Sequence, residues 1–212
     1  YSLPVNFSTG IGLSGAPAVR DALAVLETLG DAIPVLQVVA LLRSRFLHLP
    51  DAGSPLAAAF VHELFRRGSE RVGIASLRNL ATTVSDGTHE GLAIGNYLLK
   101  VSGMRELQGS AMPSRWAQLF AQVLQAWGWP GDETLDSLEY QQVKLWYRTL
   151  DAFRTLDAVT GKVDALEALR LLRQACDKQV SHPQTRESRI QVLGPLEAVG
   201  LCFDDVWICG MQ

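Results

Sequence analysis

The chain has 212 residues, of which 48% are hydrophobic and 19% are charged, and its formal net charge is −3. This composition predicts a soluble globular chain with enough apolar residues for one large domain or two small ones. The slightly acidic balance excludes a generally basic nucleic-acid-binding protein, so any contact with DNA has to come from a local patch.

The first predicted element is a short strand, Leu3–Ser8, which runs into a glycine-rich turn. Helices then follow. Pro17 stands where a helix begins and Gly30 where it ends, and Ser54 and Gly68 frame another helix in the same way. The helices expected in this part of the chain are 17–29, 33–46, 56–67, 76–84 and 88–101.

The second half of the chain contains the clearest helical patterns. Apolar residues recur at steps of three and one along a face that ends at Gly128: Trp116, Leu119, Phe120, Val123, Leu124 and Trp127. A long helix is expected from about Ser137 to Val159, and a last one over Leu166–Cys176. Two strand-like runs, Ile190–Leu193 and Val206–Cys209, follow a polar stretch. The pattern is mainly α, and no repeat of fixed length is visible.

Nothing in the sequence predicts a membrane or exported protein. No apolar run reaches the roughly 18 residues that a membrane span needs, and no signal segment opens the sequence. The three cysteines, Cys176, Cys202 and Cys209, stand among apolar residues. We therefore expect reduced core thiols and a cytoplasmic protein.

The glycines of Gly10-Ile11-Gly12-Leu13-Ser14-Gly15 match the dinucleotide fingerprint between a strand and a helix. Two prolines argue against that function. Pro17 fixes the helix start after Gly15, whereas the third glycine of the fingerprint belongs inside the helix. Pro34 interrupts the segment that has to be the second parallel strand. A plain loop is the preferred interpretation, and a dinucleotide-binding enzyme remains an alternative.

Other catalytic patterns are missing from the sequence. There is no phosphate loop and no nucleophile elbow. The four histidines are scattered, so no zinc site is expected. No acidic residue is followed two places later by lysine, as the common nuclease signature requires. We expect no catalytic residue, no metal site and no cofactor in this chain.

Arginines near helix ends and one tryptophan are the candidates for nucleic-acid contact. The residues are Arg43, Arg45, Arg66, Arg67, Arg71 and Trp129. Clustered guanidinium groups can grip phosphates, but cations also stabilise helix carboxyl ends, and the second interpretation is preferred. The indole of Trp129 either stacks on bases or fills the core.

The last segment of the chain resembles motif V of superfamily 1 helicases of the UvrD/RecB class. Residues 190–211 read IQVLGPLEAVGLCFDDVWICGM: a strand, a short loop, Gly-Leu-x-Phe, and a second strand that ends in glycine. The opening, residues 1–7 with the glycine turn and 19–26, is similar to the start of the helical 2B insertion of those enzymes. The sequences LLRSRF at 41–46 and GWPG at 128–131 are similar to a bacterial branch described as DNA repair proteins. In that branch a degraded helicase region precedes a RecB-like nuclease domain.

The resemblance implies three parts and a fold. Residues 1–15 would be a strand and glycine-rich loop of a RecA-like domain, 16–180 a helical 2B-like domain, and 181–212 the motif V-like strands. The fold class is then mainly α, a helical insertion domain flanked by a few strands of an incomplete RecA-like α/β domain. The abrupt stop at Gln212 is expected of a fragment cut from a longer protein.

Departures from motif V predict that the helicase chemistry is lost. The motif positions are Gly194, Leu196, Val199, Gly200 and Cys202. Active members usually have lysine and glutamate where this chain has Val199 and Cys202, and often a DNA-contacting histidine where it has Leu196. Apolar replacements remove the charge and hydrogen bonds that ATP and DNA require. ATP and Mg²⁺ would therefore act, if at all, elsewhere in the parent protein.

The expected function is that of an internal fragment of a DNA repair or recombination helicase-exonuclease, a cytoplasmic hydrolase acting on single-stranded DNA or DNA ends. The fragment would contribute DNA guidance or scaffolding, with weak and salt-sensitive binding of single strands. The alternative is a helical scaffold for protein partners. We also expect the ends to meet, with Val5–Ser8, Ile190–Leu193 and Val206–Cys209 in one sheet, because an insertion leaves and re-enters its host at neighbouring points.

Overall fold

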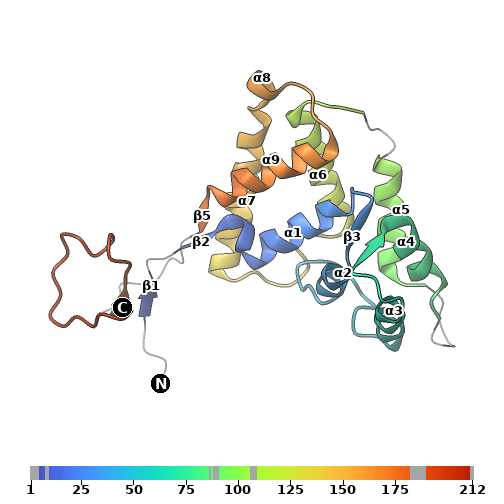
Figure 1. Ribbon diagram of the computed structural model, residues 1–212, viewed down its shortest axis with the longest axis horizontal. Coiled ribbons are helices and arrows are strands. Elements are labelled where there is room, and N and C mark those ends of the chain that lie inside the picture. Colours follow the sequence, from blue (N-terminus) through green and yellow to red (C-terminus); the bar gives the residue numbers. More distant parts are fainter. Residues whose placement is uncertain are drawn as a thin grey trace. The chain divides into compact units, whose positions relative to one another are not determined.

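The computed structural model describes residues 5–7, 10–85, 87, 91–105, 109–181 and 190–210 (Figure 1). Its contacts divide the chain into two compact units. The helical unit comprises residues 12–181, and the terminal unit comprises residues 1–11 and 182–212. The chain is mainly helical, as the sequence pattern predicts.

The helices lie close to the predicted positions. They are α1 Pro17–Glu27, α2 Val35–Leu42, α3 Pro55–Arg66, α4 Ile74–Thr83, α5 Ala93–Arg105, α6 Pro113–Ala126, α7 Ser137–Arg154, α8 Asp157–Thr160 and α9 Ala165–Asp177, with a 3-10 turn, η1, at Leu13–Gly15. Two predictions of length are corrected. The helix expected over 33–46 ends at Leu42, and the one expected over 137–159 is interrupted after Arg154.

Side-chain caps explain several helix starts. The Ser54 hydroxyl accepts a hydrogen bond from the backbone N–H of Ala57, and Pro55 occupies the first helical position of α3. At α7, Asp136 and Glu139 form a capping box in which each side chain accepts from the backbone N–H of the other. These local contacts satisfy amide groups that the helices themselves leave unpaired.

The strands are short and occur in pairs. They are β1 Val5–Phe7, β2 Ile11–Gly12, β3 Ala32–Pro34, β4 Arg71–Gly73, β5 Val180–Ser181 and β6 Ile190–Val192. The first strand, β1, pairs with β6 in parallel, β2 pairs with β5, and β3 pairs with β4 in antiparallel orientation. Residues 3, 4 and 8 of the first expected strand and most of the polar stretch before β6 lie outside the described residues.

The core of the helical unit is rich in aromatic side chains. Trp127, Trp146, Phe120 and Phe153 are among its largest fully buried residues. The ring centroids of Phe120 and Phe153 lie 6.2 Å apart and join α6 to α7. Because α7 packs against α1, α6 and α9, it occupies a central place in this unit.

A helix–strand–helix arrangement occurs twice in succession, although the sequence shows no repeat of fixed length. The strands β3 and β4 pair with each other, and each runs directly into a helix, α2 or α4. The first amides of these helices make matching hydrogen bonds: Val35 N donates to Glu70 O at 2.9 Å, and Ile74 N donates to Asp31 O at 2.9 Å. The β3–α2 segment and the β4–α4 segment therefore contact each other reciprocally, as two copies related by an approximate twofold axis do.

The same residue positions are buried in both halves of this repeat. The buried positions of 33–42 match those of 72–81 one for one: Ile33, Val35, Val38, Leu41 and Leu42 against Val72, Ile74, Leu77, Leu80 and Ala81. All ten side chains are aliphatic, but only Leu41 and Leu80 are the same residue type, so the repeat is not evident in the sequence. The two halves share apolar character and burial at each position rather than residue identity.

The terminal unit confirms one part of the expected sheet and corrects another. Val5 pairs with Ile190 and Phe7 with Val192, so the first strand and the first carboxyl-terminal strand do meet. Residues 206–209, however, form no strand, and Trp207 is 93% exposed. A β-branched run becomes a strand only beside a hydrogen-bonding neighbour, and no described strand pairs with this one.

The expected environment of the cysteines is also corrected. Cys176 is buried, and burial raises the pKa of its thiol to about 12, so it is an unreactive core residue. Cys202 and Cys209 are exposed instead of buried, because the segment that holds them has no packed neighbour among the described residues. Within the described ranges, none of the helices is both long and apolar enough for a membrane span.

Candidate functional site

Residues 41–46 and their neighbours lie against residues 127–131 in the helical unit. His48 N, just after the first segment, donates a hydrogen bond to Trp127 O at 3.0 Å. Gly131 has φ +92°, and a Cβ there would lie 2.5 Å from the carbonyl oxygen of Arg45. Gly128 has φ +69°, and a Cβ there would lie 2.6 Å from the Cβ of His48. Both glycines therefore permit a backbone approach that a side chain would block.

The loop after α2, which contains Ser44, Arg45 and Phe46, is held in place by the buried carboxylate of Asp21. The Ser44 hydroxyl donates to Asp21 Oδ2 on α1 at 2.5 Å and accepts from Phe46 N at 3.1 Å. Arg20 Nε donates to the other oxygen of Asp21 at 3.1 Å. Asp21 and Phe46 are both buried. Because a buried carboxylate needs such partners, the position of this loop is tied to α1.

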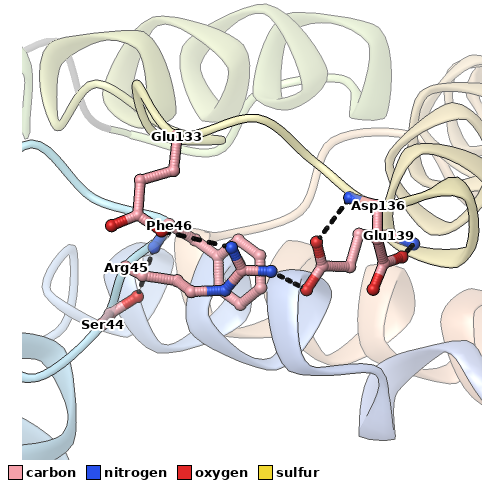
Figure 2. Close-up of polar contacts among 6 residues, drawn as sticks. All are labelled: Ser44, Arg45, Phe46, Glu133, Asp136 and Glu139. Carbon is pink, nitrogen blue, oxygen red and sulfur yellow. Dashed lines mark hydrogen bonds and ion pairs between the residues drawn. The ribbon is translucent and has the colours of Figure 1, made fainter.

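Arg45 joins this loop to the start of α7 (Figure 2). Its Nη1 lies 3.3 Å from Glu133 Oε2, and its Nη2 donates to Glu139 Oε1. Glu139 is also the capping-box residue of α7, since its second oxygen accepts from Asp136 N at 2.9 Å. The hydrogen bond that Arg45 donates to Glu139, followed by the one that it donates to Glu133, raises the pKa of Arg45. We call Arg45, Glu133, Asp136 and Glu139 the Arg45 cluster.

The contacts of the Arg45 cluster are those of a structural ion-pair network that joins two segments. The guanidinium also lies over the Phe46 ring, 4.8 Å from its centroid, and His48 pairs with Asp132 beside it. Glu133 and Glu139 each accept a hydrogen bond from Arg45, and their negative charges would repel a phosphate that approached it. The described residues contain no group of three or more side chains suited to a metal ion, and His89 and His182 lie outside them.

The other predicted arginines are dispersed, and most have partners. Arg66 donates to both oxygens of Glu63, at 2.6 and 2.8 Å, and Arg67 donates to it at 3.3 Å. These contacts, the hydrogen bond from Arg66 first, lower the pKa of Glu63 to about 2. Arg71 donates to Ala32 O at 2.6 Å. In the described part of the chain, Arg43 is exposed and has no carboxylate partner.

Trp129 is removed from the candidates for base stacking. Its side chain is buried, and its Nε1 donates to Ala18 O at 2.9 Å. Its ring meets Trp146 edge-on at 5.8 Å and Tyr147 at 6.0 Å between centroids. The indole fills the core because α1 and α7 both contribute partners to it, so no ring face is left for a base.

The predicted motif V positions fall on the exposed segment after β6. Leu196 is 88% and Val199 76% exposed, and Cys202 is exposed as well. Gly194 opens a turn in which its N–H donates to Glu197 Oε2 at 2.9 Å, and Gly200 has φ +81°, a conformation that glycine favours. The structure places these positions together on one loop, and the side chains at 196, 199 and 202 carry no charge.

The glycine motif forms a loop whose chemistry does not suit a pyrophosphate. Gly12 lies in β2, and Gly15 lies in the 3-10 turn before α1 begins at Pro17. Leu13 N donates to Gln179 O at 2.8 Å, and the Ser14 hydroxyl donates to Asp177. A carboxylate thus stands beside the loop, where it would repel an anionic ligand.

One group of exposed residues was missed in the sequence. Helix α7 was predicted from its apolar stripe alone, and its opposite face carries Tyr140, Lys144, Tyr147 and Arg148, all exposed. The sequence does contain a signal for this face. Tyr140 and Tyr147 are seven residues apart, which is about two helical turns, and Lys144 and Arg148 lie between and beside them.

Comparison with protein-family models, with curated proteins and with solved structures gives no match for this chain.

Proposed function

We propose that the chain is an internal part of a cytoplasmic DNA repair helicase-nuclease of the UvrD/RecB type. The observation that carries the proposal is the parallel pairing of β1 with β6, in which Val5 lies opposite Ile190. The whole helical unit stands between these two strands in sequence. An insertion that leaves a parallel sheet and returns to the neighbouring strand gives this connectivity.

Exposed apolar residues of the terminal unit support a larger host domain. Ile190 and Val192 of β6 are 41% and 44% exposed. Further along, large apolar side chains are exposed at Leu196, Val199, Leu201, Phe203, Val206, Trp207 and Ile208. Parallel sheets are normally covered on both faces, so a β1–β6 pair needs further strands and helices around it. A RecA-like α/β domain of the parent would supply them.

The proposed role of this part is positioning and not catalysis. The motif V positions lack the charged ligands that ATP handling requires, so ATP and Mg²⁺ would act elsewhere in the parent, and a nuclease domain would cut the DNA. The helical unit would guide single strands or DNA ends past the catalytic parts. The formal net charge of the whole chain is −3, so contact with DNA has to be local and is expected to be weak.

The test is a titration of this chain into a fluorescein-labelled oligo-dT, followed by fluorescence anisotropy at low and physiological salt. We expect saturable micromolar binding that weakens steeply as salt rises. Calorimetric titrations with ATP and with NAD are expected to show no binding. An unchanged anisotropy at the lowest salt, or saturable binding of either nucleotide, would contradict the proposal.

A second candidate function, a scaffold for protein partners, is favoured by the exposed apolar residues of 196–208. Light scattering on the same samples separates the two functions. A scaffold would associate with itself or with an added protein through this segment and leave oligo-dT unbound, and a Trp207→Ser substitution would then reduce the association.

A further inference from the structure

The outer face of α7 carries two tyrosines and two cations in a row. Tyr140 is 60% and Tyr147 49% exposed, and Lys144 and Arg148 are exposed as well. At 3.6 residues per turn, these four positions share one side of the helix. The opposite side, which holds Val143, Trp146, Leu150 and Phe153, is buried in the core. We call the four exposed residues the Tyr140–Arg148 face.

Tyr147 stands on a rigid support. Its ring meets the ring of Trp129 edge-on, with 6.0 Å between centroids. Trp129 is itself fixed by the hydrogen bond to Ala18 O and by its contact with Trp146. An aromatic ring that is already held in place loses little conformational entropy when a ligand stacks on it. The exposed half of Tyr147 is therefore suited to bind a flat group.

The cations of this face have no carboxylate partner among the described residues. The acidic residues nearest along the helix are already paired: Glu139 binds Arg45, and Asp151 lies 3.2 Å from Arg154. Arginines elsewhere on helix surfaces, such as Arg66 and Arg170, bind glutamates three residues away. Lys144 and Arg148 thus leave a local positive charge on a chain whose net charge is negative.

We propose that the Tyr140–Arg148 face binds single-stranded nucleic acid, with bases stacked on the two tyrosines and phosphates held by Lys144 and Arg148. Seven residues of helix rise about 10 Å, which matches roughly three nucleotides of a stacked strand. A purely apolar partner would provide no anion for Lys144 and Arg148, and an acidic peptide would provide no flat group to stack on the tyrosine rings. The inference rests on the proposed function and assigns its DNA contact to one helix.

The test measures binding of the full chain to labelled oligo-dT and to labelled polyphosphate of matched charge. The substitutions Tyr140→Ala/Tyr147→Ala should weaken oligo-dT binding about 30-fold, since each base–ring stack accounts for about fivefold or more. Polyphosphate binding should stay unchanged, because it has no bases. Tyr140→Phe/Tyr147→Phe should retain oligo-dT binding. Phe65→Ala, which removes an exposed ring from α3, is the matched control and should have no effect.

Neutralisation of the cations tests the phosphate contacts separately. Lys144→Gln/Arg148→Gln should lower the slope of log K against log salt by about 1.4, at about 0.7 for each single-strand phosphate. The control, Lys100→Gln/Lys162→Gln, removes the same charge from other exposed positions and should leave the slope unchanged. Circular dichroism checks that every variant remains folded.

The outcomes separate this inference from the proposed function. If the unaltered chain binds oligo-dT and the tyrosine and cation variants bind it equally well, the DNA contact lies elsewhere and only the inference is wrong. Equal losses for oligo-dT and polyphosphate in the tyrosine variant would also overturn stacking. If the unaltered chain binds no oligo-dT at low salt, both proposals are contradicted.

Discussion

Arg45 illustrates how a residue's role depends on partners that are distant in sequence. By itself it is one of several cations near helix ends, and it could bind either a phosphate or a carboxylate. Glu133 and Glu139, far along the chain, give it two carboxylates. Such exposed ion pairs contribute little free energy individually, because solvent screens them. Their effect here is to fix the loop after α2 beside the start of α7.

The glycine beside this cluster gives the first prediction. Gly131→Ala should destabilise the helical unit by about 1–3 kcal/mol, because φ is +92° and the new Cβ would meet the carbonyl oxygen of Arg45 at 2.5 Å. Urea unfolding followed by circular dichroism measures the change. The control is Gly103→Ala in α5, where a Cβ meets nothing within 4 Å and helix propensity favours alanine. A Gly131→Ala variant as stable as the parent chain would show that this loop can move aside.

Helix α7 combines three roles along one element. Its buried side supplies Trp146 and Phe153 to the core, its start carries the capping box, and its outer side carries the Tyr140–Arg148 face. The strands β3 and β4 also have more than one role. Each pairs with the other and leads directly into a helix, and the carbonyl just before each strand, Asp31 O or Glu70 O, accepts a hydrogen bond from the first amide of the other strand's helix. Elements this short are stable only because both members of each pair are present.

The capping box of α7 gives the second prediction. Asp136→Ala should destabilise the chain by about 1 kcal/mol, since it removes the side-chain acceptor for Glu139 N at 2.8 Å, whereas the hydrogen bonds that Glu139 accepts from Asp136 N and from Arg45 are retained. Asp136→Asn keeps a side-chain acceptor and should retain most of the stability. Chemical denaturation of the three proteins gives the comparison. If the asparagine variant loses as much as the alanine variant, the charge and not the cap matters at this position.

At the scale of the molecule, the two units differ in how they are held together. The helical unit has a continuous aromatic and aliphatic core, whereas described residues 193–210 of the terminal unit are mostly exposed and include many large apolar side chains. The hydrogen bonds described for this unit include the β1–β6 pair, the turn around Gly194 and a bond from Leu201 N to Ala198 O at 3.2 Å. Stability is therefore concentrated in residues 12–181.

Limited proteolysis tests this division. Chymotrypsin should first cut after Phe203 or Trp207, which are 41% and 93% exposed, and should leave a resistant fragment that retains the helices α1 to α9. Mass spectrometry of the early products identifies the sites. A first cut within α6 or α7 would contradict the proposed distribution of stability.

The sequence by itself determined the helices and much of their order. Apolar spacing in 116–127, the cap residues Ser54 and Pro55, and glycines such as Gly68 are local signals, and each acts within a few residues of where it stands. The pairing of the first strand with Ile190–Val192 was also predicted, from the logic of an insertion. These features depend on backbone preferences and on one apolar face, which a sequence pattern records directly.

Only the tertiary structure decided the roles of the candidate site residues. Trp129 fills the core because α1 and α7 both contact it, and Arg45 is paired because a distant loop brings Glu133 beside it. The run Val206–Cys209 has strand-forming residues and yet forms no strand, since a strand requires a neighbour and no sequence pattern supplies one. Burial and partnership depend on contacts between residues far apart in the chain, and local composition carries no record of them.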